Sequence, residues 1–265
     1  MAIRLPTYQI TQLPNSSTPP RLRGEIPLYY TALLAHYGPQ NWWPARSRFE
    51  VIVGAYLTQN TNWSNVEKAL LNLRRARRLG VKGIREAPLD ELETLVRPSG
   101  YFRQKARNLK TFIAFLDRQY SGSLSRMFAQ PTSKLRSELL ELNGVGPETA
   151  DSILLYAGNH PVFVVDAYTR RVLLRHGIID KKTGYEEIRS MIEHAISSSE
   201  TEALVRRNFR FRPTPPGFAH EQLCPQRTGA TLQRAACVDR QSRQSLLPHK
   251  TNLRRLPSGI VFKTS

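Results

Sequence analysis

From Glu25 to about Ile196, apolar side chains recur every three or four residues, which is the spacing of one face of an α-helix. The clearest case is the segment 47–60, whose apolar face comprises Phe49, Ile52, Val53, Tyr56 and Leu57. No segment of any length alternates apolar and polar residues as a half-buried β-strand does. We therefore expect an all-α fold in which short loops join the helices.

Capping residues mark where these helices start. Ser47 precedes Glu50 by three residues, which is the spacing of a capping box. Ser64 and Glu67 repeat this spacing, so they predict a second helix start and a helix that stops at Gly80. The same reasoning predicts helices over residues 25–38, 89–100, 101–120, 132–142, 167–177 and 183–196, and one that starts near Pro147.

The two ends of the chain lack the helical period. Residues 1–24 are basic and carry four prolines, so we expect a disordered tail rather than a targeting helix. Residues 206–265 are rich in Arg, Gln, Ser and Pro, and we expect them to be disordered as well. Residues 206–265 could also be a DNA-binding tail, or the product of a shifted reading frame that replaced the natural end, and both alternatives stay open. The folded domain is expected over residues 25–205.

Charge indicates the class of partner. Lys and Arg number 39 against 21 Asp and Glu, for a net charge of +18. Residues 206–265 contribute +10 and the rest of the chain +8, so both parts are basic. This balance favours a polyanion, with nucleic acid ahead of a membrane surface, although a basic charge can also serve solubility alone. No run of 18 apolar residues occurs, so we expect no membrane span.

Only two cysteines occur, Cys224 and Cys237, and they are 13 residues apart. Two cysteines cannot supply the four thiolates of an iron–sulfur cluster, and they give no disulfide framework. They are interpreted as ordinary thiols of a reducing cytoplasm, where we expect the protein to act in association with the nucleoid.

The segment Leu142 to Pro147 reads L-N-G-V-G-P between two helical patterns. Gly144 and Gly146 permit a tight turn and a close approach of the backbone to a ligand, and proline suits the first position of a helix. The backbone N–H groups at that helix start could bind a phosphate. A plain connection between two helices is the alternative, and the glycines alone leave both interpretations open.

Asp166 ends the apolar run Val162–Val165 and precedes a helical pattern. The commonest role of such a residue is to cap the following helix. A carboxylate beside four apolar residues is also partly dry, and its charge then acts strongly on a cation that develops nearby.

Together, these features resemble the helix-hairpin-helix DNA glycosylases of the endonuclease III superfamily over about residues 28–197. Further matches are L-T-Q-N-T-N-W at 57–63 and R-P-S-G-Y-F-R-Q-K-A-R-N-L at 97–109. The resemblance implies a two-lobed helical fold with a DNA cleft between the lobes. It implies that Asp166 serves cleavage of the N-glycosidic bond and that Gln59 fills the gap left by an extruded base. It also implies that the hairpin binds DNA phosphates through Gly144, Val145, Gly146, Glu148 and Thr149.

Two departures indicate a subgroup. Glu148 stands where bifunctional members carry a catalytic lysine, and a glutamate cannot form a Schiff base with the sugar. The iron–sulfur cysteines are also missing. In the motifs W-W-P at 42–44, L-T-Q-N-T-N-W at 57–63 and R-P-S-G at 97–100, the chain is most similar to the cluster-free 3-methyladenine glycosylases of bacteria. That likeness implies a base pocket lined by Trp42, Pro44 and Trp63. Both tryptophans could instead be core aromatics. The subgroup's lysine from a C-terminal helix has no match in residues 206–265.

The resulting hypothesis is a monofunctional DNA glycosylase that acts, as a monomer, on double-stranded DNA with a damaged base. We expect a middle bundle over 47–160 and a second lobe made of 25–38 and 161–205. No metal is expected except a monovalent cation that the hairpin could hold. Two rival hypotheses are an endonuclease III-like glycosylase with lyase activity, which acts on oxidised pyrimidines, and a non-catalytic DNA-binding module.

Overall fold

The computed structural model describes residues 26–38 and 43–196, and it contains no strand in these ranges. The elements in chain order are α2 (Ile26–Tyr37), α3 (Arg48–Leu57), α4 (Trp63–Arg75), α5 (Val81–Glu86), α6 (Leu89–Val96), the 3₁₀ helix η1 (Arg97–Ser99), α7 (Phe102–Tyr120), α8 (Leu124–Phe128), α9 (Thr132–Leu140), α10 (Pro147–Ser152), the π-helical turn η2 (Ile153–Ala157), α11 (Ala167–Arg175) and α12 (Tyr185–Ile196). The all-α class is confirmed. Within the described ranges, no helix is both long and apolar enough to cross a membrane.

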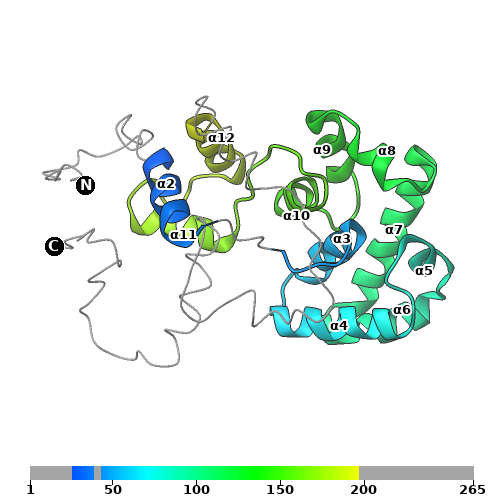
Figure 1. Ribbon diagram of the computed structural model, residues 1–265. Coiled ribbons are helices and arrows are strands. Elements are labelled where there is room, and N and C mark those ends of the chain that lie inside the picture. Colours follow the sequence, from blue (N-terminus) through cyan, green and yellow to red (C-terminus); the bar gives the residue numbers. More distant parts are fainter. Residues whose placement is uncertain (1–25, 39–42, 197–265) are drawn as a thin grey trace, which may run out of the picture.

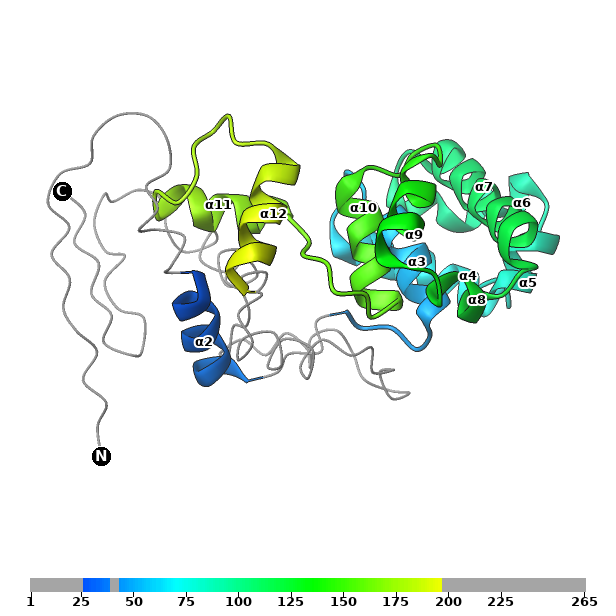
Figure 2. The same cartoon turned by 90° about the horizontal axis from the view of Figure 1, so that it is seen from above.

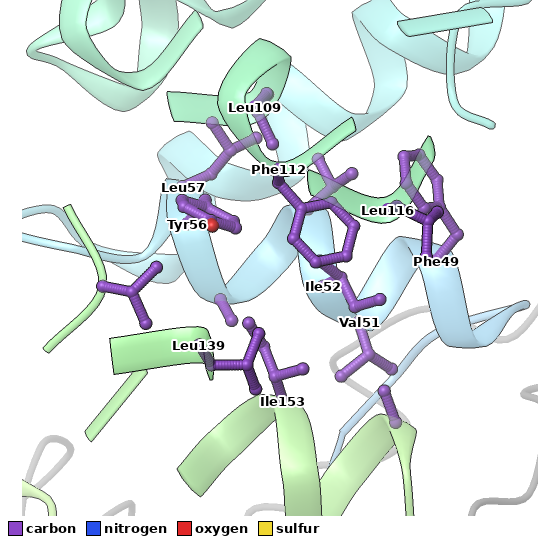
Figure 3. Packing of buried hydrophobic residues seen from close by; sticks show 14 of the residues in the cluster. Phe49, Val51, Ile52, Tyr56, Leu57, Leu109, Phe112, Leu116, Leu139 and Ile153 are labelled. Atoms are coloured by element: carbon purple, nitrogen blue, oxygen red, sulfur yellow. The ribbon is translucent and has the colours of Figure 1, made fainter. Parts of the chain in front are cut away.

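The helices α3 to α10 and η2 form the larger lobe, because their buried hydrophobic residues belong to one hydrophobic cluster, and α3 lies at its centre. Every residue of α3 except Arg48 is buried. Its Tyr56 ring meets the Phe112 ring of α7 edge-on, with 6.0 Å between the ring centres. Figure 3 shows α7 side chains on one side of α3 and Leu139 and Ile153 on the other. A helix enclosed in this way explains why apolar residues occupy nearly all of its positions.

The capping box at α3 is confirmed with one shift. The Ser47 hydroxyl oxygen accepts a hydrogen bond from the Glu50 N–H at 3.1 Å. The Glu50 carboxylate accepts from the Arg46 N–H rather than from Ser47, and it also pairs with Arg74 of α4 at 2.6 Å. The box therefore also ties the start of α3 to the neighbouring helix.

The second predicted capping box is wrong. The cap of α4 lies two residues earlier than expected, because the Asn62 side chain accepts from the Asn65 N–H at 3.1 Å. The Ser64 hydroxyl donates to the same Asn62 side chain. Asparagine caps helices at least as well as serine, so the earlier residue forms the cap. The predicted stop at Gly80 is also wrong, since α4 ends at Arg75 and Gly80 precedes α5.

A smaller lobe joins the start of the described chain to its end. Ile26 of α2 packs in one hydrophobic cluster with Leu173 of α11 and with Ile188 and Ile192 of α12. Figures 1 and 2 show α2, α11 and α12 side by side and apart from the helices of the larger lobe. The two-lobed arrangement expected from the sequence is confirmed.

The apolar run before Asp166 contributes to both lobes. Val162 and Val164 lie in the cluster of the larger lobe, whereas Val165 lies in the smaller one and Phe163 packs against it. Alternate residues of an extended segment point to opposite sides, so a single run can serve two cores. In Figure 2 this segment crosses between the lobes.

Candidate DNA-binding hairpin and active site

The turn between α9 and α10 requires one of its two glycines. Gly144 has φ +79°, and a Cβ atom there would lie 2.0 Å from the Asn108 side-chain nitrogen. Gly146 has φ −91° and open space around its Cβ position. The fold therefore demands glycine at 144, whereas at 146 only the approach of another molecule would require it.

Backbone N–H groups at the start of α10 are the candidate donors to a DNA phosphate. The Val145 N–H closes the turn by donating to the Leu142 carbonyl at 3.0 Å, so it is not a free donor for phosphate. The N–H groups of Gly146, Glu148 and Thr149 have no acceptor among the described residues. Of the predicted phosphate-binding residues, these three carry the donors that a helix start offers to an anion.

Gln59 lies directly against the hairpin. Its side-chain amide donates to the Gly144 carbonyl at 2.8 Å and to the Thr149 hydroxyl at 2.9 Å. The predicted gap-filling residue and the predicted phosphate-binding turn, 85 residues apart in sequence, are thus brought together. Entry of Gln59 into a duplex would break both hydrogen bonds.

Tyr101 is an exposed aromatic residue that was not predicted from the sequence. Its backbone is left-handed, with φ +46°, and its side chain is 69% exposed. The buried Lys105 ammonium donates to the Ser99 carbonyl at 2.6 Å and to the Leu57 carbonyl at 3.0 Å, so the loops that carry Tyr101 and Gln59 are tied together. Burial lowers the pKa of Lys105 to about 8. The only feature of the sequence that could have indicated this residue is its position directly after Gly100.

Asp166 is confirmed as the cap of α11, and its role in catalysis stays a prediction. It caps α11, because its carboxylate accepts from the Thr169 N–H at 2.7 Å. Burial raises the pKa of Asp166, and backbone hydrogen bonds such as that from Thr169 partly offset the increase. The capping hydrogen bond orients the carboxylate, and poor hydration strengthens its attraction for a nearby positive charge.

Glu148 of α10 is close enough to Asp166 for the two carboxylates to repel each other. Reduced hydration, and then the charge of Asp166, raise the pKa of Glu148 to about 7, although its side chain reaches solvent. The two residues belong to α10 and to the start of α11, so the fold brings them together from different lobes. Two carboxylates at one place favour a cation between or beside them.

We predict that Glu148→Gln removes a pH dependence of stability. A carboxyl whose folded pKa is about 7 instead of 4.5 holds its proton more tightly in the folded state. Wild-type stability should therefore fall as pH rises from about 4.5 to about 7. The variant should unfold at a higher temperature than wild type at pH 8, and at a similar temperature at pH 4. Thermal unfolding measured across this range checks the prediction, and parallel curves for the two proteins would contradict it.

The predicted base pocket is only partly described. Trp42 lies outside the described residues, and Pro44 is half-buried. The half-buried Trp63 ring meets the Trp43 ring edge-on, with 5.8 Å between the ring centres. Trp43 also contacts Tyr156 of η2, with 5.2 Å between the ring centres, and both tryptophans pack against the core of the larger lobe. Trp43 and Tyr156 were not predicted from the sequence, since nothing in the pattern separates the first tryptophan of W-W-P from the second.

No group of three or more His, Cys, Asp or Glu side chains within the described ranges could hold a metal ion. Cys224 and Cys237 lie outside those ranges. At the hairpin, the Leu142 and Gly144 carbonyl oxygens each accept one hydrogen bond, which leaves one lone pair on each. A monovalent cation at this turn stays a prediction.

The chain that forms this site matches a known protein family. Residues 53–197 match the model of the HhH-GPD superfamily base excision DNA repair proteins, and this segment contains the hairpin, Gln59 and Asp166. The chain belongs to that superfamily. It is therefore a DNA N-glycosylase of base excision repair, and its partner is DNA.

Individual relatives agree with the family. A protein of Methanocaldococcus jannaschii, named as a candidate DNA repair glycosylase, is 49% identical over 166 residues, which are 62% of this chain and 75% of that protein. Endonuclease III of Thermotoga maritima is 31% identical over 52% of this chain and 61% of its own length. The structure of H. pylori 3-methyladenine DNA glycosylase, bound to 1,N6-ethenoadenine, has a TM-score of 0.61 and 30% identity over 84% of this chain and 98% of that one.

Proposed function

We propose that this glycosylase is monofunctional and hydrolyses the N-glycosidic bond of an alkylated purine such as 3-methyladenine. One observation carries the proposal: position 148 holds a carboxylate where a bifunctional glycosylase needs an amine, and the charge of Asp166 is near enough to affect it. A carboxylate cannot form the Schiff base that precedes strand cleavage. Water is then left as the nucleophile that reacts with the sugar.

The pair of carboxylates suits a reaction that develops positive charge. An alkylated purine such as 3-methyladenine is a cation before it leaves, so departure needs no strong general acid. The sugar becomes cationic as the bond breaks, and the Asp166 carboxylate, oriented by its bond to Thr169, can stabilise that charge. Glu148 adds a second negative charge above its pKa of about 7.

The aromatic residues support a purine substrate. Trp63, with Trp43 beside it, offers an electron-rich ring on the larger lobe. A cation over such a ring gains about 0.5–2 kcal/mol, and stacking offsets the cost of extruding a base. The similarity to the H. pylori 3-methyladenine glycosylase supports the same substrate class. The proposal requires Trp63 and Asp166 to approach one nucleotide from the two lobes.

DNA affinity is predicted to depend on salt through phosphate contacts. The N–H groups at the start of α10, together with a net charge of +18, favour binding to the backbone rather than to bases. On duplex DNA, each phosphate neutralised changes the logarithmic slope by about −0.9, so a fourfold rise in salt weakens binding about 3.5-fold per phosphate. Titration of an undamaged duplex between 50 and 200 mM salt measures this slope. A slope near zero would contradict the prediction.

A second function, that of an endonuclease III-like glycosylase with lyase activity, is favoured by the similarity to the Thermotoga enzyme. Glu148 argues against it. The two functions differ in one covalent step, the attack of a protein amine on the sugar, which borohydride converts into a stable complex.

The deciding experiment combines base release with borohydride trapping. Wild-type protein should release 3-methyladenine from methylated duplex DNA and form no trapped complex. Glu148→Lys, which restores an amine at this position, should form one if the geometry is as proposed. A trapped complex with wild-type protein would move the enzyme to the bifunctional class. DNA binding without any base release would favour the non-catalytic module.

A further inference from the structure

The segment that leads to Asp166 hydrogen-bonds to side chains instead of to a sheet. The Phe163 N–H donates to the Glu193 carboxylate at 2.9 Å, and the Val165 N–H donates to the Tyr185 hydroxyl oxygen at 3.3 Å. Both acceptors belong to α12. In an extended segment the N–H groups of residues i and i+2 point to the same side, so one helix can hold both.

Tyr185 connects this segment to the hairpin helix. Its hydroxyl group accepts from the Val165 N–H and donates to the Asp151 carboxylate of α10 at 2.9 Å. A phenol can do both at once. Burial, and then the negative charge of Asp151, raise the pKa of Tyr185, so the phenol keeps its proton and remains a donor. The peptide before Asp166 is thereby joined to the helix that carries Glu148.

Asp151 is a rigid acceptor for this bond. It is fully buried, and Arg136 of α9 donates to both of its oxygens, at 2.7 and 3.1 Å. The same guanidinium group reaches Glu186 of α12 at 2.6 Å. A buried carboxylate held by a bidentate guanidinium has little freedom to move, so it can fix the phenol in turn.

We propose that Tyr185 is a positioning residue for Asp166: its hydroxyl group holds the Val165 peptide at a fixed place relative to the hairpin helix and thereby fixes the Asp166 carboxylate opposite the sugar. The inference rests on the role of Asp166 proposed above. Among the described residues the segment has no strand beside it, so the packing of its valines and these side-chain acceptors together hold it in place. Small misplacements of a reacting group can lower a rate about 100-fold.

Tyr185→Phe removes only the hydroxyl group. The expected result is a roughly 10- to 100-fold lower single-turnover rate of base release from methylated duplex DNA, with DNA affinity within about threefold of wild type. Hydrogen exchange of the peptide that contains Val165 should become roughly 2- to 12-fold faster, because this change in rate corresponds to the net free energy of one lost hydrogen bond. Glu193→Ala, which removes the acceptor of Phe163, should lower the rate in the same direction but less, because Phe163 is further from Asp166.

Tyr120→Phe is the matched control. The Tyr120 hydroxyl group also donates to a carboxylate, that of Glu138, but this bond joins α7 to α9 within the larger lobe and involves neither α12 nor the segment before Asp166. This variant should retain the wild-type rate and the wild-type exchange of the Val165 peptide, even if it loses some stability.

Three outcomes overturn the inference: a Tyr185→Phe rate within about threefold of wild type, a loss of DNA affinity that accounts for the loss of rate, and an equal loss in Tyr120→Phe. If Tyr185→Phe does not fold, the rate of Glu193→Ala decides by the same criteria. Asp166→Asn is measured in parallel. If it releases base at the wild-type rate, the role of Asp166 fails. If it is inactive while Tyr185→Phe is normal, only the positioning role of Tyr185 fails.

Discussion

Replacing Asp166 by asparagine is expected to lower the single-turnover rate of base release by about 10²- to 10³-fold. The Asp166 carboxylate is half-buried in a poorly hydrated place and held by the Thr169 N–H, so its charge stabilises the sugar cation strongly. Asparagine has nearly the same shape and still accepts the capping hydrogen bond, but it carries no charge. The expected loss of rate is therefore confined to the step that breaks the N-glycosidic bond, and DNA affinity should stay within about threefold of wild type.

A comparison with Asp166→Ala separates the two roles of this residue. Alanine removes both the charge and the cap, so it should lower the rate as asparagine does and also cost about 0.5–2 kcal/mol of stability. Asparagine should leave the unfolding temperature near or above that of wild type, because burial raises the pKa of Asp166 and so disfavours its charge in the folded state. An asparagine variant with the wild-type rate would leave Asp166 as a cap only.

Replacing Trp63 by alanine is expected to lower excision of 3-methyladenine by roughly 5- to 150-fold, since base–aromatic stacking contributes about 1–3 kcal/mol. Trp63 is half-buried against Trp43, so part of its surface is committed to the core and part can meet a base. Single-turnover release from methylated duplex DNA measures the effect. Trp63→Phe keeps an aromatic face and should lose less.

Two controls distinguish a pocket residue from a core aromatic. If Trp63 serves the core alone, the alanine variant should lose stability while the folded fraction retains its rate. Release of oxidised pyrimidines from otherwise identical duplexes tests the substrate class, because a neutral pyrimidine gains no cation–π contact with an electron-rich ring and no charge attraction from two carboxylates. Faster release of oxidised pyrimidines than of 3-methyladenine would reject the pocket assignment and favour the lyase alternative.

Local patterns in the sequence predicted most of the helices. The capping signal at Ser47 and the long apolar pattern before Tyr120 correspond to α3 and α7. The short helices α5 and α8 were not predicted, because six and five residues hold too little of a helical period to recognise. At α4 the signal was misread, since Asn62 and Ser64 are both good caps and only the packed structure shows which one is used.

The amino-acid sequence was sufficient to predict the all-α class and the glycine turn before Pro147, and to show the basic charge and a carboxylate, not an amine, at position 148. These are properties of residue type and short-range spacing. The packing of the helices was needed to show that Glu148 lies close enough to Asp166 to be affected by its charge, that Gln59 binds the hairpin and that Tyr185 holds the segment before Asp166. Each of these contacts joins residues that are distant along the chain. Their formation depends on how α10, α11 and α12 pack between two hydrophobic cores, and no local pattern encodes that packing.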